Sequence, residues 1–280
     1  MNKIVSQIKF GWRLFVSRNL SMRMFLPLLL LGFVCHIFLA PLRSFAEAVQ
    51  HPAAPFVFPL LLSDVYFLTL FMAFAVYYFS DAPFMKNWTM YQVIRTGRVR
   101  WALGQIQAIV MSAFLFVTAA ACLAGLLLLP YITLREGWGK VLYTLSVKGM
   151  SGDFSVPYGI IGQYTVLEAM GITILTGGLV LSFLGLLMFC ISLSGFRLCA
   201  NITAMAFVIL PVVQLNIGTD VPALVWLSPV SWMNLAGGNG GGSGPPPGYC
   251  TAALGGLCVL LGAAVIWKIR TVDFQMVKED

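Results

Sequence analysis

Two ionisable side chains, Asp64 and His36, lie inside long apolar stretches of this 280-residue chain. An acid at membrane depth is unfavourable, so it is a candidate for carrying a proton or lining a substrate path. A histidine titrates near neutral pH and could serve similar chemistry. Both also have structural explanations: Asp64 lies near the outer end of its stretch, where it can bond to a neighbouring helix, and His36 can pack in the core. Glu168, at the entrance of a later stretch, fits an interfacial position.

Catalysis within the apolar stretches would need paired groups, such as clustered Glu, His and Asp or a Ser-Lys pair. Asp64 and His36 fall on different predicted helices and form no such motif. The six cysteines lack metal-ligand spacing and fit buried free thiols. The sequence contains no phosphate loop of the form G-x-x-x-x-G-K-[ST], so any ATP must be bound by a second polypeptide. We therefore predict no catalytic, cofactor-binding or metal-binding residues in this chain.

The most informative polar stretch is the loop that follows the stretch containing Asp64. Ser80 or Asp81 can cap a helix, Pro83 suits its first turn and Gly97 can end it, which predicts a helix over 81–97. The spacing i, i+4, i+7 places three aromatic residues on one face, beside several basic residues: Phe84, Trp88 and Tyr91, with Lys86, Arg95, Arg98 and Arg100. Such a face can lie on lipid headgroups or dock into a groove of a soluble partner, and we favour docking.

Composition indicates that these residues belong to a membrane protein. The chain is 59% hydrophobic and only 10% charged, with a mean hydropathy of +0.89. A crossing helix needs about 20 apolar residues, because the hydrocarbon core is about 30 Å thick. We therefore predict one all-α integral membrane domain with six transmembrane helices, at residues 24–42, 56–80, 101–130, 165–193, 200–217 and 249–267. The second inserts despite Asp64, because its many Leu, Val and Phe residues, at about 0.3–0.6 kcal/mol each, outweigh one acid at about 2.5–3.5 kcal/mol.

The basic residues predict the orientation of the spans. Of 17 Lys and Arg residues, only four fall on one predicted side of the membrane, namely Arg43, Arg135, Lys140 and Lys148. Loops rich in Lys and Arg stay in the cytoplasm, so both termini are predicted inside and the protein in the plasma membrane of a bacterial cell. This bias also explains the net charge of +7 without nucleic acid as a partner.

Residues 1–20 have helical periodicity, with Ile4, Ile8, Trp12 and Phe15 on one face. This arrangement predicts an amphipathic helix in the plane of the cytoplasmic membrane surface, in contact with lipid. A cleaved signal usually has a shorter basic region and a small-residue cleavage site, and neither is found here. The alternative is that the basic residues merely set topology, which leaves the apolar stripe unexplained.

Two outer segments are long. Residues 131–164 could form an external gate or a passive loop. Residues 218–248 begin with an apolar run that includes Trp226, Pro229 and Trp232, and they end in a flexible Gly- and Pro-rich linker.

This layout resembles that of a type-2 ABC transporter permease. The resemblance covers nearly the whole chain as architecture, and its local content is the loop 81–100 and the outer run 222–235. It implies that 81–97 is the coupling helix, seated on a separate ATPase subunit through Phe84, Met85, Trp88, Tyr91 and Arg95. It also implies that the segment with Trp226, Pro229 and Trp232 re-enters the outer leaflet.

The resemblance leads us to expect the permease subunit of an ATP-driven exporter for an amphiphilic or hydrophobic substrate. Its partners would be a nucleotide-binding subunit, which holds ATP and Mg, and a second permease subunit of the same or a related kind. Two alternatives stay open at this point. One is a proton-coupled secondary transporter that uses Asp64, which predicts inverted repeats that the sequence does not clearly contain. The other is an intramembrane enzyme.

Overall fold

Long runs of Leu, Ala, Phe and Val can bury their backbone polar groups in lipid only as helices, because each helix pairs its own N–H and C=O groups. The computed structural model agrees with this expectation, since every regular element in it is helical. It describes residues 2–19, 22–51, 54, 56–82, 89–131, 137–148, 156–217, 223–239 and 244–271.

Four helices in this part of the chain are long and apolar enough to cross a bilayer. They are α7 (Arg98–Leu128, extended by the short 3₁₀ helix η1, Leu129–Tyr131), α10 (Val166–Ser192), α11 (Arg197–Ile217) and α14 (Pro247–Thr271). A fifth candidate span is formed by α1 (Asn2–Asn19) and α2 (Met22–Phe38), which meet at a bend of 58°. The structure therefore supports a multi-pass membrane protein with four or five candidate spans.

The predicted second span is not one continuous helix, which corrects the expectation for residues 56–80. It consists of α4 (Phe58–Leu61) and α5 (Val65–Phe79), separated by a turn. At 1.5 Å per residue, the 15 residues of α5 are about 22 Å long, which is short of the hydrocarbon core. The break lies where Asp64 adopts an extended backbone and starts a new helix.

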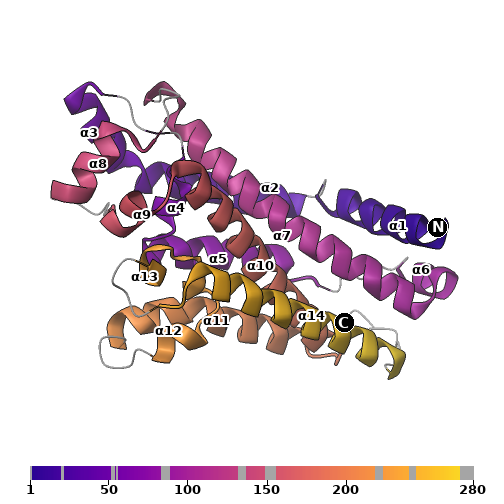
Figure 1. Cartoon of the computed structure of the whole chain (residues 1–280). Helices are drawn as coiled ribbons and strands as arrows, with labels where there is room; N and C mark the ends of the chain where they lie inside the picture. Colours follow the sequence, from indigo (N-terminus) through magenta and orange to yellow (C-terminus); the bar gives the residue numbers. More distant parts are fainter. Residues whose placement is uncertain are drawn as a thin grey trace.

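Short helices gather at one end of the bundle, and the N-terminus lies with α6 (Thr89–Thr96) at the other (Figure 1). The first group comprises α3 (Ala40–Val49), α8 (Gly139–Lys148), α9 (Tyr158–Gln163), α12 (Ala223–Leu227) and α13 (Ala236–Asn239). We name this the outer end and the opposite one the inner end, after the sides predicted from charge. The described residues of the segment 131–164, expected as a gate or a loop, thus form two helices, α8 and α9. The indole N–H of Trp138, just before α8, donates to the carbonyl of Tyr164, just after α9, over 2.9 Å.

The basic residues of the described chain follow these two ends. By the helices that carry them, the basic residues of the inner end include Lys9, Arg13, Arg95, Arg98, Arg100, Arg197, Lys268 and Arg270, and those of the outer end include Arg43, Lys140 and Lys148. Lys268 shows how one of them is used, because its ammonium donates to the Cys190 carbonyl over 3.1 Å and also bonds Ser194. A cation thereby satisfies carbonyls at the C-terminus of α10, where the helix dipole favours positive charge.

Helix α10 is the centre of the bundle and packs against α5, α7, α11 and α14. Its glycines permit the close approach. A Cβ added at Gly185 would lie 2.7 Å from Ile109 Cγ2 of α7 and 3.1 Å from Phe79 Cδ1 of α5. Because both neighbours are fully buried, neither can move aside easily, and this position requires glycine.

The helix predicted for residues 1–20 is present, but it runs alongside α7 and not across it. Gln7 donates to the Arg100 carbonyl over 2.9 Å, and Asn19 reaches Ser112 over 3.4 Å. The two contacts are twelve residues apart along α1 and also twelve residues apart along α7, so the two helices run nearly parallel. Helix α1 therefore packs along a candidate span, and its orientation in the plane of the membrane surface stays a prediction.

The loop helix predicted over 81–97 is described only in its second half, as α6. Residues 81 and 82 form a turn, and residues 83–88 lie outside the described part of the chain. Gly97 ends α6 as expected, with φ at +86°, and the chain then enters α7 directly.

Candidate functional site

The outer run 223–239 turns back into the bundle. It contains α12, the 3₁₀ helix η2 (Ser231–Met233) and α13. Pro229 is buried, Trp232 is only 8% exposed and Met233 is fully buried. Trp226, by contrast, stays 45% exposed and packs edge-to-face on Tyr249, with ring centroids 5.3 Å apart. Two of the three predicted residues of this segment, Pro229 and Trp232, are therefore inside the fold, and Trp226 is at its surface.

The depth of the segment follows from the neighbours of Met233. Its terminal methyl would lie 2.9 Å from a Cβ added at Gly177, and Val117 flanks the same position. Gly177 lies eleven residues into α10 and Val117 eleven residues before the end of α7, which is about 17 Å from either outer helix end. Both helices thus place Met233 at the same depth, well inside the outer half of the bundle.

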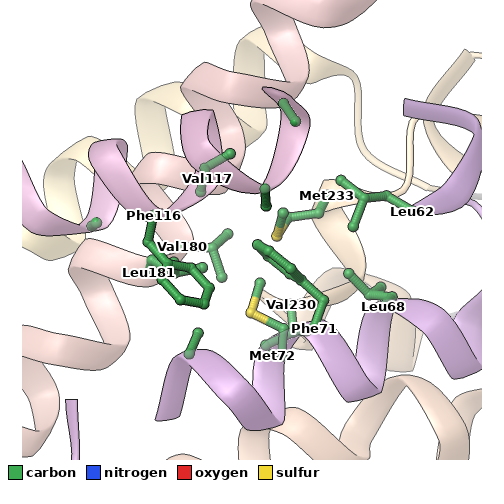
Figure 2. Close-up of a cluster of buried hydrophobic side chains, with 14 of the residues drawn as sticks. Leu62, Leu68, Phe71, Met72, Phe116, Val117, Val180, Leu181, Val230 and Met233 are labelled. Carbon is green, nitrogen blue, oxygen red and sulfur yellow. The ribbon is translucent and has the colours of Figure 1, made fainter. Parts of the chain in front are cut away.

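Figure 2 shows the packed cluster around this methionine, to which α5, α7, α10 and the returning segment contribute. We call Leu62, Phe71, Val117, Val230 and Met233 the outer cluster. All five side chains are fully buried. The ring of Phe71 also contacts Phe58 edge-on at 5.8 Å and Phe116 at 5.7 Å. Apolar side chains from these elements therefore pack together in the outer half of the bundle.

Polar side chains attach the returning segment to its surroundings. Asn234 donates from Nδ2 to the Ser63 carbonyl over 3.2 Å, at the break between α4 and α5, and its Oδ1 accepts from the Ala236 N–H over 2.9 Å. The hydroxyl of Ser231 lies 2.7 Å from Gln214 Oε1 of α11 and 2.7 Å from Ser228 Oγ. These bonds connect the segment to two different spans.

Sequence reasoning named the aromatic residues and Pro229 but missed Asn234, Ser231 and Gln214. Short polar residues next to a buried proline could have signalled a bonded turn. Their partners could not have been identified, because Asn234 and Ser63 are 171 positions apart.

Asp64 is the N-cap of α5. Its Oδ1 accepts from the N–H groups of Tyr66 over 2.8 Å and Phe67 over 2.9 Å. A carboxylate in this position satisfies two of the four free N–H groups at a helix start and favours the dipole. Asp64 thus has a structural role, with bonds to its own helix and not to the neighbouring one that was expected, and its place in a translocation path stays a prediction.

The other two ionisable candidates also have local roles. His36 Nδ1 lies 3.0 Å from Arg43 Nη1, and the Nη2 of the same arginine donates to the His36 carbonyl over 3.0 Å. Glu168 forms a capping box with Thr165 at the start of α10, since each side chain accepts from the other residue's N–H. The structure does not bring Asp64, His36 and Glu168 together. Within the described residues, no group of His, Cys, Asp and Glu has the geometry of a metal site.

The predicted docking residues are only partly placed. Phe84, Met85 and Trp88 lie outside the described part of the chain, and Tyr91 is placed by its backbone in α6. Arg95, in the last turn of α6, is exposed, and the neighbouring Ile94 is 78% exposed. On the opposite face, Val93 is buried. The described half of this loop helix therefore has one covered face and one open face.

Comparison with known proteins identifies no relative. No protein-family model, no curated protein and no solved structure matches this chain.

Proposed function

We propose that the protein is the permease subunit of an ATP-driven exporter, built from six crossings with both termini in the cytoplasm. The observation that supports the proposal is the division of the bundle into two unlike ends. Basic residues and the exposed face of α6 are at one end, and a returning apolar segment closes the other. In this proposal α2, the broken pair α4 and α5, and the four long helices are the six crossings.

The mechanism proposed for the inner end is docking of a separate nucleotide-binding subunit on the loop helix. Phe84, Met85, Trp88, Tyr91 and Arg95 would form the contact, and the partner would supply ATP and Mg. A short amphipathic helix inserted in a groove is an established way to join two proteins. The exposure of Ile94 and Arg95 on α6 is in keeping with such a contact.

The mechanism proposed for the outer end is a gate. The returning segment is attached to the break in the second span through Asn234, and to α11 through Ser231. Force applied at the loop helix would reach the gate through α5, which joins the break to the loop. A substrate that passes between two such subunits would meet mainly apolar side chains, which suits an amphiphilic or hydrophobic molecule such as a peptide, drug or lipid.

Co-purification tests this function. The tagged protein is extracted from its native membrane in mild detergent, and the accompanying polypeptides are identified by mass spectrometry. We expect a nucleotide-binding subunit that is retained by the native chain and lost from the Phe84→Ala/Trp88→Ala variant. The matched control is Tyr158→Ala, which removes an exposed aromatic ring at the outer end. Equal retention by both variants, or transport by the purified chain alone, would overturn the proposal.

A further inference from the structure

Helix α1 has two apolar faces, and the described part of the chain covers one of them. The covered face packs on α7, where Phe10 and Leu14 contact Gly104. We name the uncovered residues the outer face of α1. They are Val5 at 46% exposed, Ile8 at 53%, Trp12 at 52% and Val16 at 37%.

The depth of α1 is given by the spans beside it. Helix α5 ends at Phe79, level with Ile109 of α7, because both side chains adjoin Gly185. From Ile109 back to Arg98, α7 therefore projects beyond the end of α5 by about 17 Å. Helix α1 runs beside this projecting part. Gln107 contacts both Gly11 and the Ile8 carbonyl. The pairing of Gln7 with Arg100 and of Asn19 with Ser112 places Trp12 about 6 Å and Lys9 about 10 Å beyond the end of α5.

Two exposed cations flank the outer face at this level. Lys9 and Arg13 are both exposed, and both lie on the edge of the stripe formed by Val5, Ile8, Trp12 and Val16. The first acidic residue of the sequence is Glu47, so the residues that adjoin Lys9 and Arg13 along the chain supply no carboxylate. Tryptophan with Lys or Arg at the edge of the hydrocarbon core is typical of contact with lipid headgroups.

We propose that the outer face of α1, with Lys9 and Arg13, is a binding surface for anionic phospholipid of the cytoplasmic leaflet. The apolar side chains would contact the upper acyl chains, and the two cations would bind the phosphates. Anionic lipids are concentrated in that leaflet and attract basic segments next to the membrane. A soluble partner is disfavoured, because Val16 lies close to the Ser112 level of α7, within the apolar part of the bundle.

A bonded cluster links this surface to the end of α5. The Tyr78 hydroxyl donates to Asn19 Oδ1 over 2.5 Å, and Arg18 donates to the Tyr78 carbonyl over 3.3 Å. The Arg18 guanidinium also lies 4.3 Å from the centre of the Tyr78 ring, which stacks on Phe116. Lipid held on α1 would thus stabilise the last turn of α5, from which the chain enters the loop 83–88. This consequence for coupling rests on the proposed function, whereas the lipid binding does not.

The full chain, purified in phosphatidylcholine nanodiscs, is titrated with brominated dioleoylphosphatidylglycerol while tryptophan fluorescence is recorded. We expect quenching that saturates for the native chain and is reduced in Trp12→Phe. Lys9→Gln/Arg13→Gln should weaken binding by about fivefold for each charge removed. The control Arg197→Gln/Lys140→Gln lowers the net charge equally, at two exposed positions away from α1, and should stay within about twofold of the native chain. Equal loss in both double variants, or equal quenching by brominated phosphatidylcholine, would overturn the proposal.

The connection between the lipid surface on α1 and the end of α5 is tested by hydrogen exchange on the same samples. Phosphatidylglycerol should slow exchange at the end of α5 in the native chain and leave it unchanged in Tyr78→Phe, which lacks the bond to Asn19. Slowing of equal size in both chains would show that the cluster does not connect the two sites. Neither measurement involves transport or an ATPase, so failure of the proposed function and failure of lipid binding are distinguishable.

Discussion

The outer cluster and the outer face of α1 are made of the same kinds of side chain, yet one is buried and the other is exposed. In the outer cluster, a segment from late in the chain returns and covers residues of α5, α7 and α10 (Figure 2). Around α1, the residues that the structure describes cover the side that faces α7 and leave the side with Val5, Ile8, Trp12 and Val16 exposed. An apolar side chain thus becomes core or contact surface according to whether another segment reaches it.

The polar residues differ between the two regions in the same way. Beside the outer cluster, Asn234 and Ser231 are bonded to other parts of the chain. Beside the outer face of α1, Lys9 and Arg13 extend outward and are exposed. The comparison fits the proposal that lipid covers the α1 surface, whereas the returning segment at the outer end is bonded within the chain. Substitutions in the two regions should therefore have unequal effects.

The largest effect is expected from Met233→Ala. Truncating a fully buried methionine leaves a cavity and should lower the free energy of unfolding by about 2–5 kcal/mol. The measurement is unfolding in mixed micelles with increasing dodecyl sulfate. Leu227→Ala, in the same segment but 72% exposed, is the control and should change the free energy little. A Met233 variant as stable as the Leu227 variant would mean that the returning segment is not packed in the bundle.

A smaller loss is expected from Asn234→Ala. This change removes the bond to the Ser63 carbonyl and should cost about 1–3 kcal/mol, since a half-buried carbonyl loses its partner. The same unfolding assay applies. Asn216→Ala is the matched control, because Asn216 is exposed and bonds only within its own helix, to Val212. Equal effects would remove the argument that Asn234 attaches the gate to the second span.

Two substitutions of Asp64 distinguish a role as helix cap from a role in proton transfer. Asp64→Ala should cost about 0.5–2 kcal/mol, whereas Asp64→Asn should keep most of the stability, because asparagine is as good an N-cap as aspartate. Transport in vesicles with only a pH gradient should not depend on Asp64. Loss of gradient-driven uptake in the stable Asp64→Asn variant would support the proton-coupled alternative instead.

The smallest effect on stability is expected on α1. Ile8→Ala should change the free energy of unfolding in zwitterionic detergent by no more than about 0.5 kcal/mol, as is usual at an exposed site. Phe10→Ala, two residues further along and on the side that faces α7, should cost clearly more, because the Phe10 ring packs against Gly104. A larger loss of stability in Ile8→Ala than in Phe10→Ala would mean that the face with Ile8 is the packed one, which would contradict the lipid-binding proposal.

Local sequence predicted the helices well where a segment is uniformly apolar. The predicted spans 101–130 and 165–193 match α7 and α10 within a few residues, and the wider α11 includes Pro211 without a break. The prediction of one continuous helix was wrong at 56–80, where the summed hydropathy favoured a single span but the structure has two helices, α4 and α5. Hydropathy adds side-chain terms, but it does not register that Asp64 satisfies the backbone of Phe67 and so starts a second helix.

What the sequence by itself determined is that most of this chain lies in an apolar environment, that it is helical there, and that its basic residues gather at one end. These properties depend on composition and on neighbours within a few turns. Only the tertiary structure decided that Met233 reaches Gly177 and that Gly11, not Trp12, faces α7. Those contacts join residues that are 56 to 96 positions apart, and they depend on which helix pairs can approach closely, which no local pattern of residues encodes.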